Sequence, residues 1–291
     1  NTCAFIDSAK QESIDAILEM AQHKNGGSCS RLVVTGCLGE RYRDELKKEI
    51  PEIDAVLGTG EVEGHLGAIA GPGLGARGSG LGVSAVNGPV PMTFHRSASA
   101  LPAPSPETRA PSPELPTYLY DADTPRLLTT PKHFAYVKIA EGCDYTCAFC
   151  IIPTLRGKFR SRDAASIVRE ARSLADRGVK ELLLISQDTT FYGIDKGERG
   201  ALARLLRELN AIDGLDWIRL LYLYPTTITN DVLSAMADCE KVCRYIDLPL
   251  QHASAAVLKR MRRPGDRRAY DKLLARIRNA VPDVTLRTTF I

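Results

Sequence analysis

The chain has 291 residues, of which 44% are hydrophobic and 25% charged, and its formal net charge is +3. These values are typical of a folded, soluble protein of about two domains, and the charge is too small to indicate nucleic-acid binding. The sequence shows no secretory signal and no apolar run long enough for a transmembrane helix, so no membrane association is expected. The 8 cysteines indicate metal binding in a reducing cytoplasm rather than a disulfide scaffold.

Residues 1–69 have the pattern of an α/β domain. The predicted elements are a helix from a capping box at Ser8 and Gln11 to Gly26-Gly27, a strand over 31–35, a helix over 40–50 and a strand over 55–57. Cys3 and Cys37 both lie at strand-to-helix turns. We expect two neighbouring parallel strands to bring these cysteines together.

Residues 70–116 change in character. Gly dominates the first half of this segment, and Pro, Ala and Ser dominate the second. A segment without an apolar period cannot bury enough surface to offset its ordering entropy. We interpret it as a flexible insertion or linker between two domains and assign it no function.

Residues 117–291 alternate between predicted strands and helices. The strands are expected over 134–140, 181–186, 217–224, 245–249 and 284–291, and the helices over 163–177, 201–210, 230–238, 255–261 and 270–280. Such alternation predicts a parallel sheet with right-handed crossovers. The fold class is therefore α/β, with an N-terminal α/β domain followed by a partial TIM-type (βα) barrel. Chemistry in such barrels lies at the carboxyl ends of the strands.

A C-x3-C-x2-C motif follows the first barrel strand, formed by Cys143, Cys147 and Cys150. Three thiolates in one loop can hold three irons of a cubic iron–sulfur cluster, which leaves the fourth iron open to a substrate. A structural zinc site would need a fourth Cys or His at short spacing, and none follows before His252. A zinc-bound interaction module and a set of buried thiols remain the alternatives.

This motif, with Phe149 before its third cysteine, resembles that of the radical S-adenosylmethionine (SAM) superfamily. The resemblance implies that the open iron binds SAM and that Phe149 lies near the adenine. It also implies SAM contacts for Ser186, Gln187 and Asp188, and places Gln251 near the ribose. The alternative for these four polar residues is that they cap the ends of strands.

The segments around Cys3 and Cys37 resemble two cysteine motifs of the methylthiotransferase domain. In that family this domain precedes the radical SAM barrel and holds a second, auxiliary 4Fe-4S cluster through three cysteines. The resemblance implies that Cys3 and Cys37 are two of these ligands and that the third lies upstream. The auxiliary site is therefore expected to be incomplete here.

Four segments resemble the RimO-like branch, namely 118–121 with 124–126, 150–158, 186–190 and 247–252. That branch adds a methylthio group to the β-carbon of an aspartate in the twelfth small-subunit ribosomal protein. In that branch a radical derived from SAM removes a hydrogen atom from the β-carbon. The electrons come from a donor such as flavodoxin or ferredoxin. No side chain here is expected to act as a catalytic acid, base or nucleophile. The alternatives are a MiaB-like transfer-RNA adenosine methylthiotransferase and, in a different class, an iron–sulfur electron carrier.

Two further features complete the interpretation. A basic cluster surrounds Pro264-Gly265 and consists of Lys259, Arg260, Arg262, Arg263, Arg267 and Arg268. Such a run is typical of a solvated helix face, and contact with ribosomal RNA is the functional alternative. The chain begins without Met and stops within a strand-like run. We therefore expect a fragment of a longer protein, with a C-terminally truncated barrel and no activity by itself.

Overall fold

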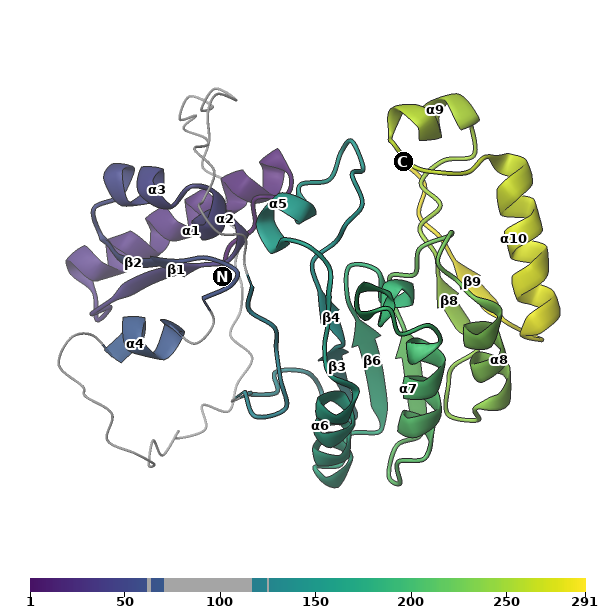
Figure 1. The fold of residues 1–291 in the computed structure, drawn as a ribbon. Helices are drawn as coiled ribbons and strands as arrows, with labels where there is room; N and C mark the ends of the chain where they lie inside the picture. The colour runs from purple at the N-terminus through teal and green to yellow at the C-terminus, as the bar shows by residue number, and fades with distance from the viewer. Residues whose placement is uncertain (62–63, 71–116, 125) are drawn as a thin grey trace.

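The computed structural model describes residues 1–61, 64–70, 117–124 and 126–291. In this part of the chain, the buried apolar residues form two separate cores. The smaller core lies in the N-terminal unit and the larger in the unit that holds the remaining strands (Figure 1). The predicted insertion over 70–116 lies outside the described residues except for its first residue, so the domain boundaries stay a prediction.

The N-terminal unit pairs two parallel strands with helices around them. Its elements are α1 (Asp7–Gly26), β1 (Leu32–Thr35), α2 (Cys37–Arg41), α3 (Arg43–Glu49), β2 (Ile53–Leu57) and α4 (Gly64–Ala70). The predicted capping box is wrong, because Ile6 is the N-cap of α1 and no side chain caps that helix. The single helix predicted over 40–50 is two helices, since Tyr42 leaves the helical conformation at φ −130° and ψ 34°.

The larger unit alternates strands and helices as predicted. Its elements are β3 (Phe134–Lys138), β4 (Ala140–Glu141), α5 (Ile152–Arg156), β5 (Arg160–Ser161), α6 (Ala164–Asp176), β6 (Glu181–Ile185), η1 (Thr189–Phe191), η2 (Ile194–Lys196), α7 (Ala201–Asn210), β7 (Trp217–Leu220), α8 (Asn230–Asp238), β8 (Tyr245–Asp247), α9 (Ala255–Arg260), α10 (Arg267–Ala280) and β9 (Thr285–Arg287). The helices α7 and α8 have the predicted bounds.

The main strands of this unit are parallel and follow one another in chain order. The pairs β3–β6, β6–β7 and β8–β9 are all parallel. A parallel bridge between Ile218 and Val242, and a 2.9 Å bond from Leu223 N to Asp247 O, connect β7 to β8. All five carboxyl ends therefore meet at one edge, and the prediction of a barrel-type (βα) unit after an α/β unit is confirmed.

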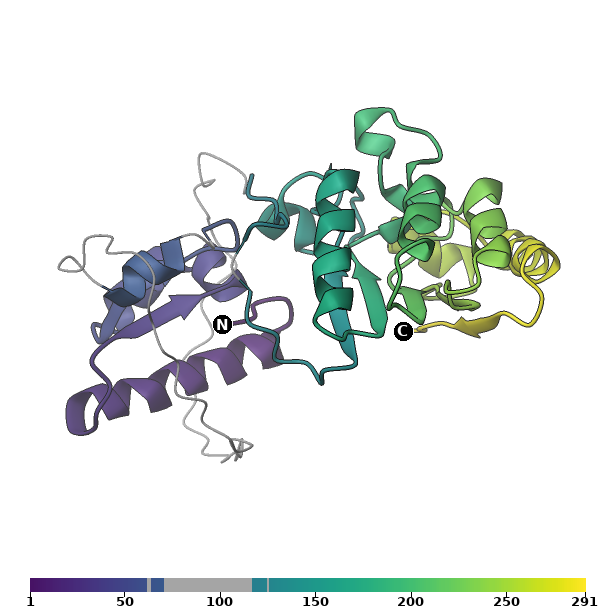
Figure 2. The ribbon, with the colours of Figure 1, turned by 90° about the horizontal axis from the view of Figure 1, so that it is seen from below.

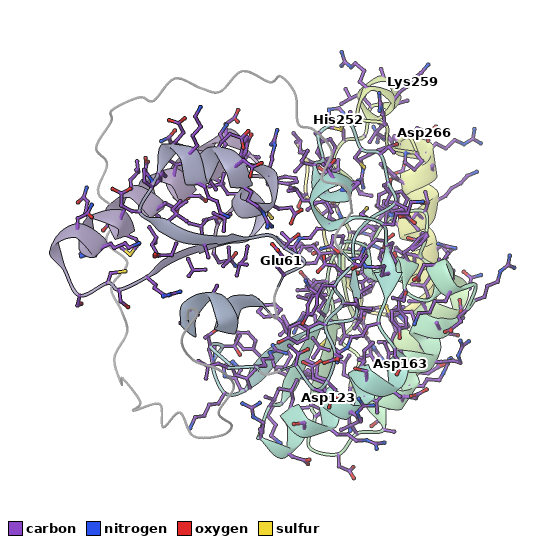
Figure 3. The ribbon with its side chains drawn as sticks, turned by 60° about the vertical axis from the view of Figure 1, so that its left-hand side comes forward. Glu61, Asp123, Asp163, His252, Lys259 and Asp266 are labelled. Carbon is purple, nitrogen blue, oxygen red and sulfur yellow. The ribbon has the colours of Figure 1, made fainter. Side chains whose placement is uncertain are left out.

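Helices cover the outer side of these strands in a continuous row. The helix α6 packs beside α7, α7 beside α8, and α8 beside α10 (Figures 1 and 2). Asp163 caps α6 as predicted by accepting a 3.0 Å bond from Ser166 N, and Asp266 caps α10 in the same way through Ala269 N at 2.7 Å (Figure 3). These caps supply acceptors that the first turn of a helix lacks.

All five strands predicted over 117–291 are shorter than expected, and three of them differ by more than two residues or by a break. The strand predicted over 134–140 splits into β3 and β4, and β4 pairs antiparallel with β5. The strand predicted over 217–224 ends at Leu220, because Tyr222 has a left-handed φ of +59° that a strand cannot contain. The last strand spans only Thr285–Arg287.

Candidate functional site

The cysteine loop leaves the barrel edge directly after β4. Gly142 has a φ of +86°, and a Cβ atom there would lie 2.1 Å from the carbonyl oxygen of Lys158. Cys143 N donates to Gly157 O at 3.1 Å, so the start of the loop lies against the segment that follows α5. Only glycine fits this close approach of two backbones, and the loop is therefore directed over the carboxyl ends of the strands.

The three thiols of the loop share one neighbourhood. Burial raises the pKa of Cys143 to about 11, and the charges of Cys150 and Cys147 add to the rise. Burial also raises the pKa of Cys150, and Cys147 again contributes. The thiols of the loop therefore influence one another's ionisation.

Three half-buried thiols in one loop are a donor set that fits an iron–sulfur cluster, because each becomes a ligand once its proton is lost. Among the residues that the structure describes, no group of three or more Cys, His, Asp and Glu side chains is placed so that it could hold a metal ion. The loop therefore supplies the donor atoms of a cluster site, but this structure does not place them in a ligating arrangement.

A column of aromatic and cationic side chains lies beside this loop. Tyr145 stacks on Tyr224 with ring centroids 3.9 Å apart, and the guanidinium of Arg263 lies 4.6 Å from the Tyr224 ring. Arg263 Nη1 also lies 3.7 Å from the sulfur of Cys147. The prediction that Arg263 belongs to a solvated basic face is wrong for this residue, although the other five members of the cluster are exposed.

The polar residues predicted to contact SAM follow β6 and β8, at the same edge as the cysteine loop. Gln187 and Gln251 each have a buried side-chain oxygen without a hydrogen-bond partner. Ser186 is buried and its hydroxyl lies 3.4 Å from that of Thr189. Phe149 is 42% exposed, which leaves its ring available to a ligand.

Asp188 differs from the other predicted residues. It is 1% exposed and accepts bonds from Tyr145 Oη at 3.0 Å, Thr190 N at 2.9 Å and Thr227 Oγ1 at 3.2 Å. Burial raises its pKa, against the lowering effect of these bonds. Because the carboxylate caps η1 and is satisfied internally, its geometry favours the strand-end capping alternative over a SAM contact.

Cys3 and Cys37 lie on adjacent segments of the N-terminal unit, as predicted. Thr2 bridges Gly36 in parallel, and Cys37 N donates to Thr2 O at 3.1 Å. Burial raises the pKa of Cys37, the charge of Arg156 lowers it, and the charge of Cys3 raises it. Arg156 belongs to the larger unit, so this cysteine pair lies where the two units meet.

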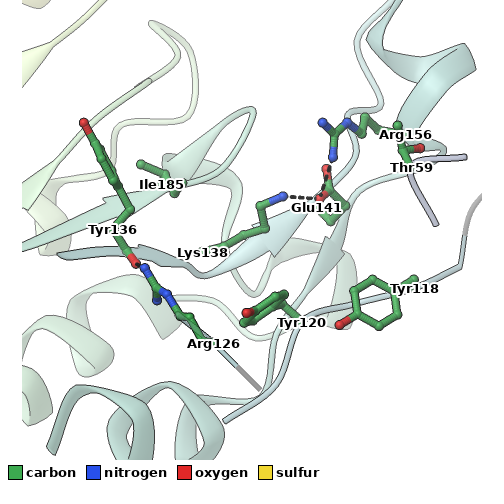
Figure 4. A pocket seen from close by; sticks show the side chains of 9 residues that line it. All are labelled: Thr59, Tyr118, Tyr120, Arg126, Tyr136, Lys138, Glu141, Arg156 and Ile185. Atoms are coloured by element: carbon green, nitrogen blue, oxygen red, sulfur yellow. Dashed lines mark hydrogen bonds and ion pairs between the residues drawn. The ribbon is translucent and has the colours of Figure 1, made fainter. Parts of the chain in front are cut away.

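A pocket of about 290 Å³ occupies the junction between the units. Its principal lining residues are Tyr118, Tyr120, Arg126, Lys138, Glu141 and Arg156 (Figure 4). Thr59 of the N-terminal unit completes one wall and donates to Leu155 O at 2.7 Å across the junction. Two of its lining residues lie near the cysteines in the chain or in space: Glu141 is two residues before Cys143, and Arg156 ends the α5 helix that packs against α2, which begins at Cys37.

Glu141 is the central charge of this pocket. Lys138 Nζ pairs with its carboxylate, and Arg156 Nη1 lies 3.3 Å from Oε2 (Figure 4). Gln187 Nε2 donates to Oε1 at 2.9 Å. Burial opposes ionisation, but the charges of Lys138 and Arg156 outweigh it and hold the pKa of Glu141 below its usual value. Sequence reasoning missed this cluster, because the partners of Glu141 are 3 to 46 positions away from it in the chain.

Comparison with known proteins agrees with this geometry. Residues 137–291 match the radical SAM superfamily, and residues 1–58 match the uncharacterized protein family UPF0004. The first match covers more than half of the chain. The chain therefore belongs to the radical SAM superfamily.

Two curated relatives align over the whole chain. Ribosomal protein uS12 methylthiotransferase RimO of Koribacter versatilis is 50% identical, and the chain covers 60% of it. RimO of Desulfitobacterium hafniense is 45% identical and is covered to 58%. The chain thus spans about three fifths of the length of these relatives.

Among solved structures, the radical S-adenosylmethionine methyltransferase TsrM of Kitasatospora setae, with cobalamin and a 4Fe-4S cluster bound, matches 54% of this chain and 30% of its own. The identity is 18% and the TM-score 0.44. In the part of our chain that the structure describes, no helix is long and apolar enough to cross a membrane.

Proposed function

We propose that this chain is part of a radical SAM methylthiotransferase that modifies an aspartate of ribosomal protein uS12. The observation that carries the proposal is the presence of two cysteine groups near one pocket, one in the loop after Glu141 and one at the start of α2, which packs against the α5 helix that ends in Arg156. The Cys143 loop begins two residues after Glu141, and Cys37 is under the electrostatic influence of both Arg156 and Glu141. The similarity to two RimO proteins over the whole chain supports the same substrate.

Cys143, Cys147 and Cys150 would hold a 4Fe-4S cluster that binds SAM, and Cys3 and Cys37 would contribute to an auxiliary cluster. When bound, these groups supply one-electron chemistry at an unactivated carbon and the methylthio sulfur. Phe149, Ser186, Gln187 and Gln251 would orient SAM at the barrel edge. The two unpaired oxygens of Gln187 and Gln251 support this role, because buried acceptors without a donor are rare in folded proteins.

The remaining partners follow from the same proposal. The clusters would receive electrons from a reducing protein such as flavodoxin or ferredoxin, and the enzyme would act in the cytoplasm. Lys259, Arg260, Arg262, Arg267 and Arg268 are exposed at the end of the molecule that carries α9 and the start of α10, and they would face ribosomal RNA if the substrate is modified on the ribosome (Figure 3).

The proposal is tested in a strain from which the uS12 methylthiotransferase and the transfer-RNA methylthiotransferase have both been deleted. The strain receives the full-length gene of the protein to which this chain belongs. Mass spectrometry of uS12 should show a mass increase of one methylthio group on an aspartate, and transfer RNA should stay unmodified. A methylthio group on transfer-RNA adenosine, with uS12 unchanged, would overturn the proposal.

Metal analysis tests the assignment of ligands separately. After anaerobic reconstitution, a Cys143→Ala, Cys147→Ala, Cys150→Ala triple variant should lose about four irons per chain, the content of one cubic cluster. Cys239→Ala is the matched control, because Cys239 is buried in the core of the larger unit, where no ligand role is proposed. Equal iron in both variants would contradict the assignment.

A further inference from the structure

The pocket between the two units carries an uncompensated positive charge. Lys138 and Arg156 both pair with one carboxylate, that of Glu141. The three groups together have a net charge of +1, because two cations share a single anion. Arg126, which also lines the pocket, pairs at 2.6 Å with Glu170, a carboxylate that it shares with Arg162. One further carboxylate would therefore neutralise the cluster.

Both cations retain hydrogen-bonding capacity. An ammonium group has three donors and a guanidinium has five, of which Glu141 takes one from each side chain. Arg156 Nε is buried without a partner in the structure. An unpaired buried donor is costly, and a second acceptor in the pocket would remove this cost.

Glu141 is fixed in its own position. Gln187 Nε2 donates to Oε1 at 2.9 Å, and Gly142 N donates to the same oxygen at 3.3 Å. The carboxylate therefore orients Lys138 and Arg156 without being free to move with an incoming ligand. Tyr118 and Tyr120 form an aromatic wall below the two cations (Figure 4). This wall could pack against the residues of a peptide that flank the bound carboxylate.

The position of the cations matters for the reaction. Lys138 ends β3 and lies five residues before Cys143, whereas Arg156 ends α5, which packs against the α2 helix that begins at Cys37. A carboxylate held by both cations would therefore lie close to the segments that carry both cysteine groups. In an aspartate side chain the β-carbon is bonded directly to the carboxyl carbon, so fixing the carboxylate also fixes the reacting carbon.

We propose that Lys138 and Arg156 bind the side-chain carboxylate of the target aspartate in an acidic peptide substrate, and that Glu141 is a positioning residue for both cations. This inference rests on the proposed function and deepens it. A neutral adenine base would leave the charge of +1 uncompensated in a partly buried site, so the pair also discriminates against a nucleobase acceptor.

Peptide binding tests the inference without turnover. Fluorescence anisotropy would be measured with a labelled peptide that contains the target aspartate of uS12 and with its Asp→Asn twin. The wild-type protein should bind the aspartate peptide about 10- to 100-fold more tightly, the factor that a hydrogen-bonded charge pair typically supplies. Lys138→Met and Arg156→Gln should each abolish most of this preference, whereas Lys138→Arg should retain it.

Lys132→Met is the matched control. Lys132 is exposed before the start of β3, at the opposite end of the strand from Lys138, and its substitution removes the same charge. Thermal unfolding of every variant would check that it is folded. If Lys138→Met does not fold, Lys138→Arg and Arg156→Gln keep the test decisive. Equal affinity of the wild-type protein for both peptides, or a preference that survives in Lys138→Met and Arg156→Gln, would overturn the inference.

The outcomes separate this inference from the proposed function. Methylthiolation of uS12 by a wild-type protein that does not distinguish the two peptides would overturn the carboxylate site alone. A clear preference for the aspartate peptide without methylthiolation of uS12 would support the carboxylate site and count against the proposed function. Modification of transfer RNA together with equal peptide binding would overturn both.

Discussion

The guanidinium of Arg263 lies 3.7 Å from the sulfur of Cys147, although the two residues are 116 positions apart in the chain. Arg263 is held there by a 3.0 Å bond from Nη2 to Pro249 O and by its position over the Tyr224 ring. A fixed cation beside a proposed cluster ligand should act on the charge of that cluster, because hydrogen bonds to sulfur and net charge both set reduction potentials.

We therefore predict that Arg263→Gln lowers the reduction potential of the cluster held by the Cys143 loop. Reduction adds an electron, and a neighbouring cation stabilises the more negative state, so its removal should shift the potential down by roughly 50–100 mV. Potentiometric titration followed by electron paramagnetic resonance would measure the shift. Arg260→Gln, an exposed position in the same basic cluster, should leave the potential unchanged, and a similar shift in both variants would contradict the prediction.

The sequence could predict features that depend on local patterns. Asp163 caps α6 as predicted, because an N-cap needs only the residues of the first turn. The cysteine loop also lies at the carboxyl end of the first barrel strand, where the spacing of its three thiols indicated a binding site. These features depend on short stretches of chain whose geometry changes little with the surroundings.

Features that depend on distant contacts could not be predicted. Arg263 belongs to a run of basic residues, and nothing in that run distinguishes the one side chain that turns toward Cys147. Asp188 has the sequence position of a ligand contact, but Tyr145 and Thr227 satisfy its carboxylate from other segments. The pocket around Glu141 likewise depends on how two units meet, which local pattern does not encode.

Removal of one partner from a buried ion pair beside α6 should lower the free energy of unfolding of the larger unit. Arg162 is 1% exposed and pairs with Glu170, which is 7% exposed. We predict that Glu170→Gln lowers the free energy of unfolding by about 3 kcal/mol, because it leaves the Arg162 charge buried without a counterion. Denaturant unfolding would measure this change.

The neighbouring surface pair provides the control for this prediction. Arg169 and Asp123 pair at 3.3 Å with side chains that are 57% and 83% exposed. Asp123→Asn should therefore cost less than about 0.5 kcal/mol, as is usual for exposed ion pairs. If Glu170→Gln lowered the free energy of unfolding by no more than Asp123→Asn does, the buried pair would not stabilise the fold.

Asp54 should make the stability of the N-terminal unit depend on pH. Hydrogen bonds from Lys24 Nζ and Leu32 N, both at 2.7 Å, hold its pKa below the ordinary value of 3.8. A carboxylate with a lowered pKa stabilises the fold above its unfolded pKa, and this stability is lost as the pH falls through the lower, folded pKa. Asp54→Asn should therefore lower stability at pH 7 by about 1 kcal/mol or less.

The difference between wild type and Asp54→Asn should be constant at neutral pH and shrink only below pH 3.8, where the wild-type carboxyl group gains its proton. Hydrogen exchange of the β1 amides, measured by mass spectrometry, would report on this unit separately from the barrel. Lys24→Met should give a similar loss at pH 7, and little further loss when combined with Asp54→Asn. A stability difference that begins to shrink above pH 5 would contradict the assignment.

We expect Gly142 to be required for the cysteine loop to hold the cluster proposed for it. Its φ of +86° and the 2.1 Å approach of a Cβ atom to Lys158 O mean that Gly142→Ala must displace the backbone at the start of the loop. Gly178 provides a matched control, because it has nearly the same φ of +89° and no atom within 4 Å of the Cβ position. Gly178→Ala should therefore cost only the conformational strain of about 1–2 kcal/mol, whereas Gly142→Ala adds a backbone collision.

The iron content of the reconstituted variants tests this difference. Gly142→Ala should retain less than about half of the iron of one cubic cluster, measured by metal analysis together with denaturant unfolding, and Gly178→Ala should retain all of it. Equal iron contents in the two variants would show that the position of the loop does not depend on the close approach at Gly142.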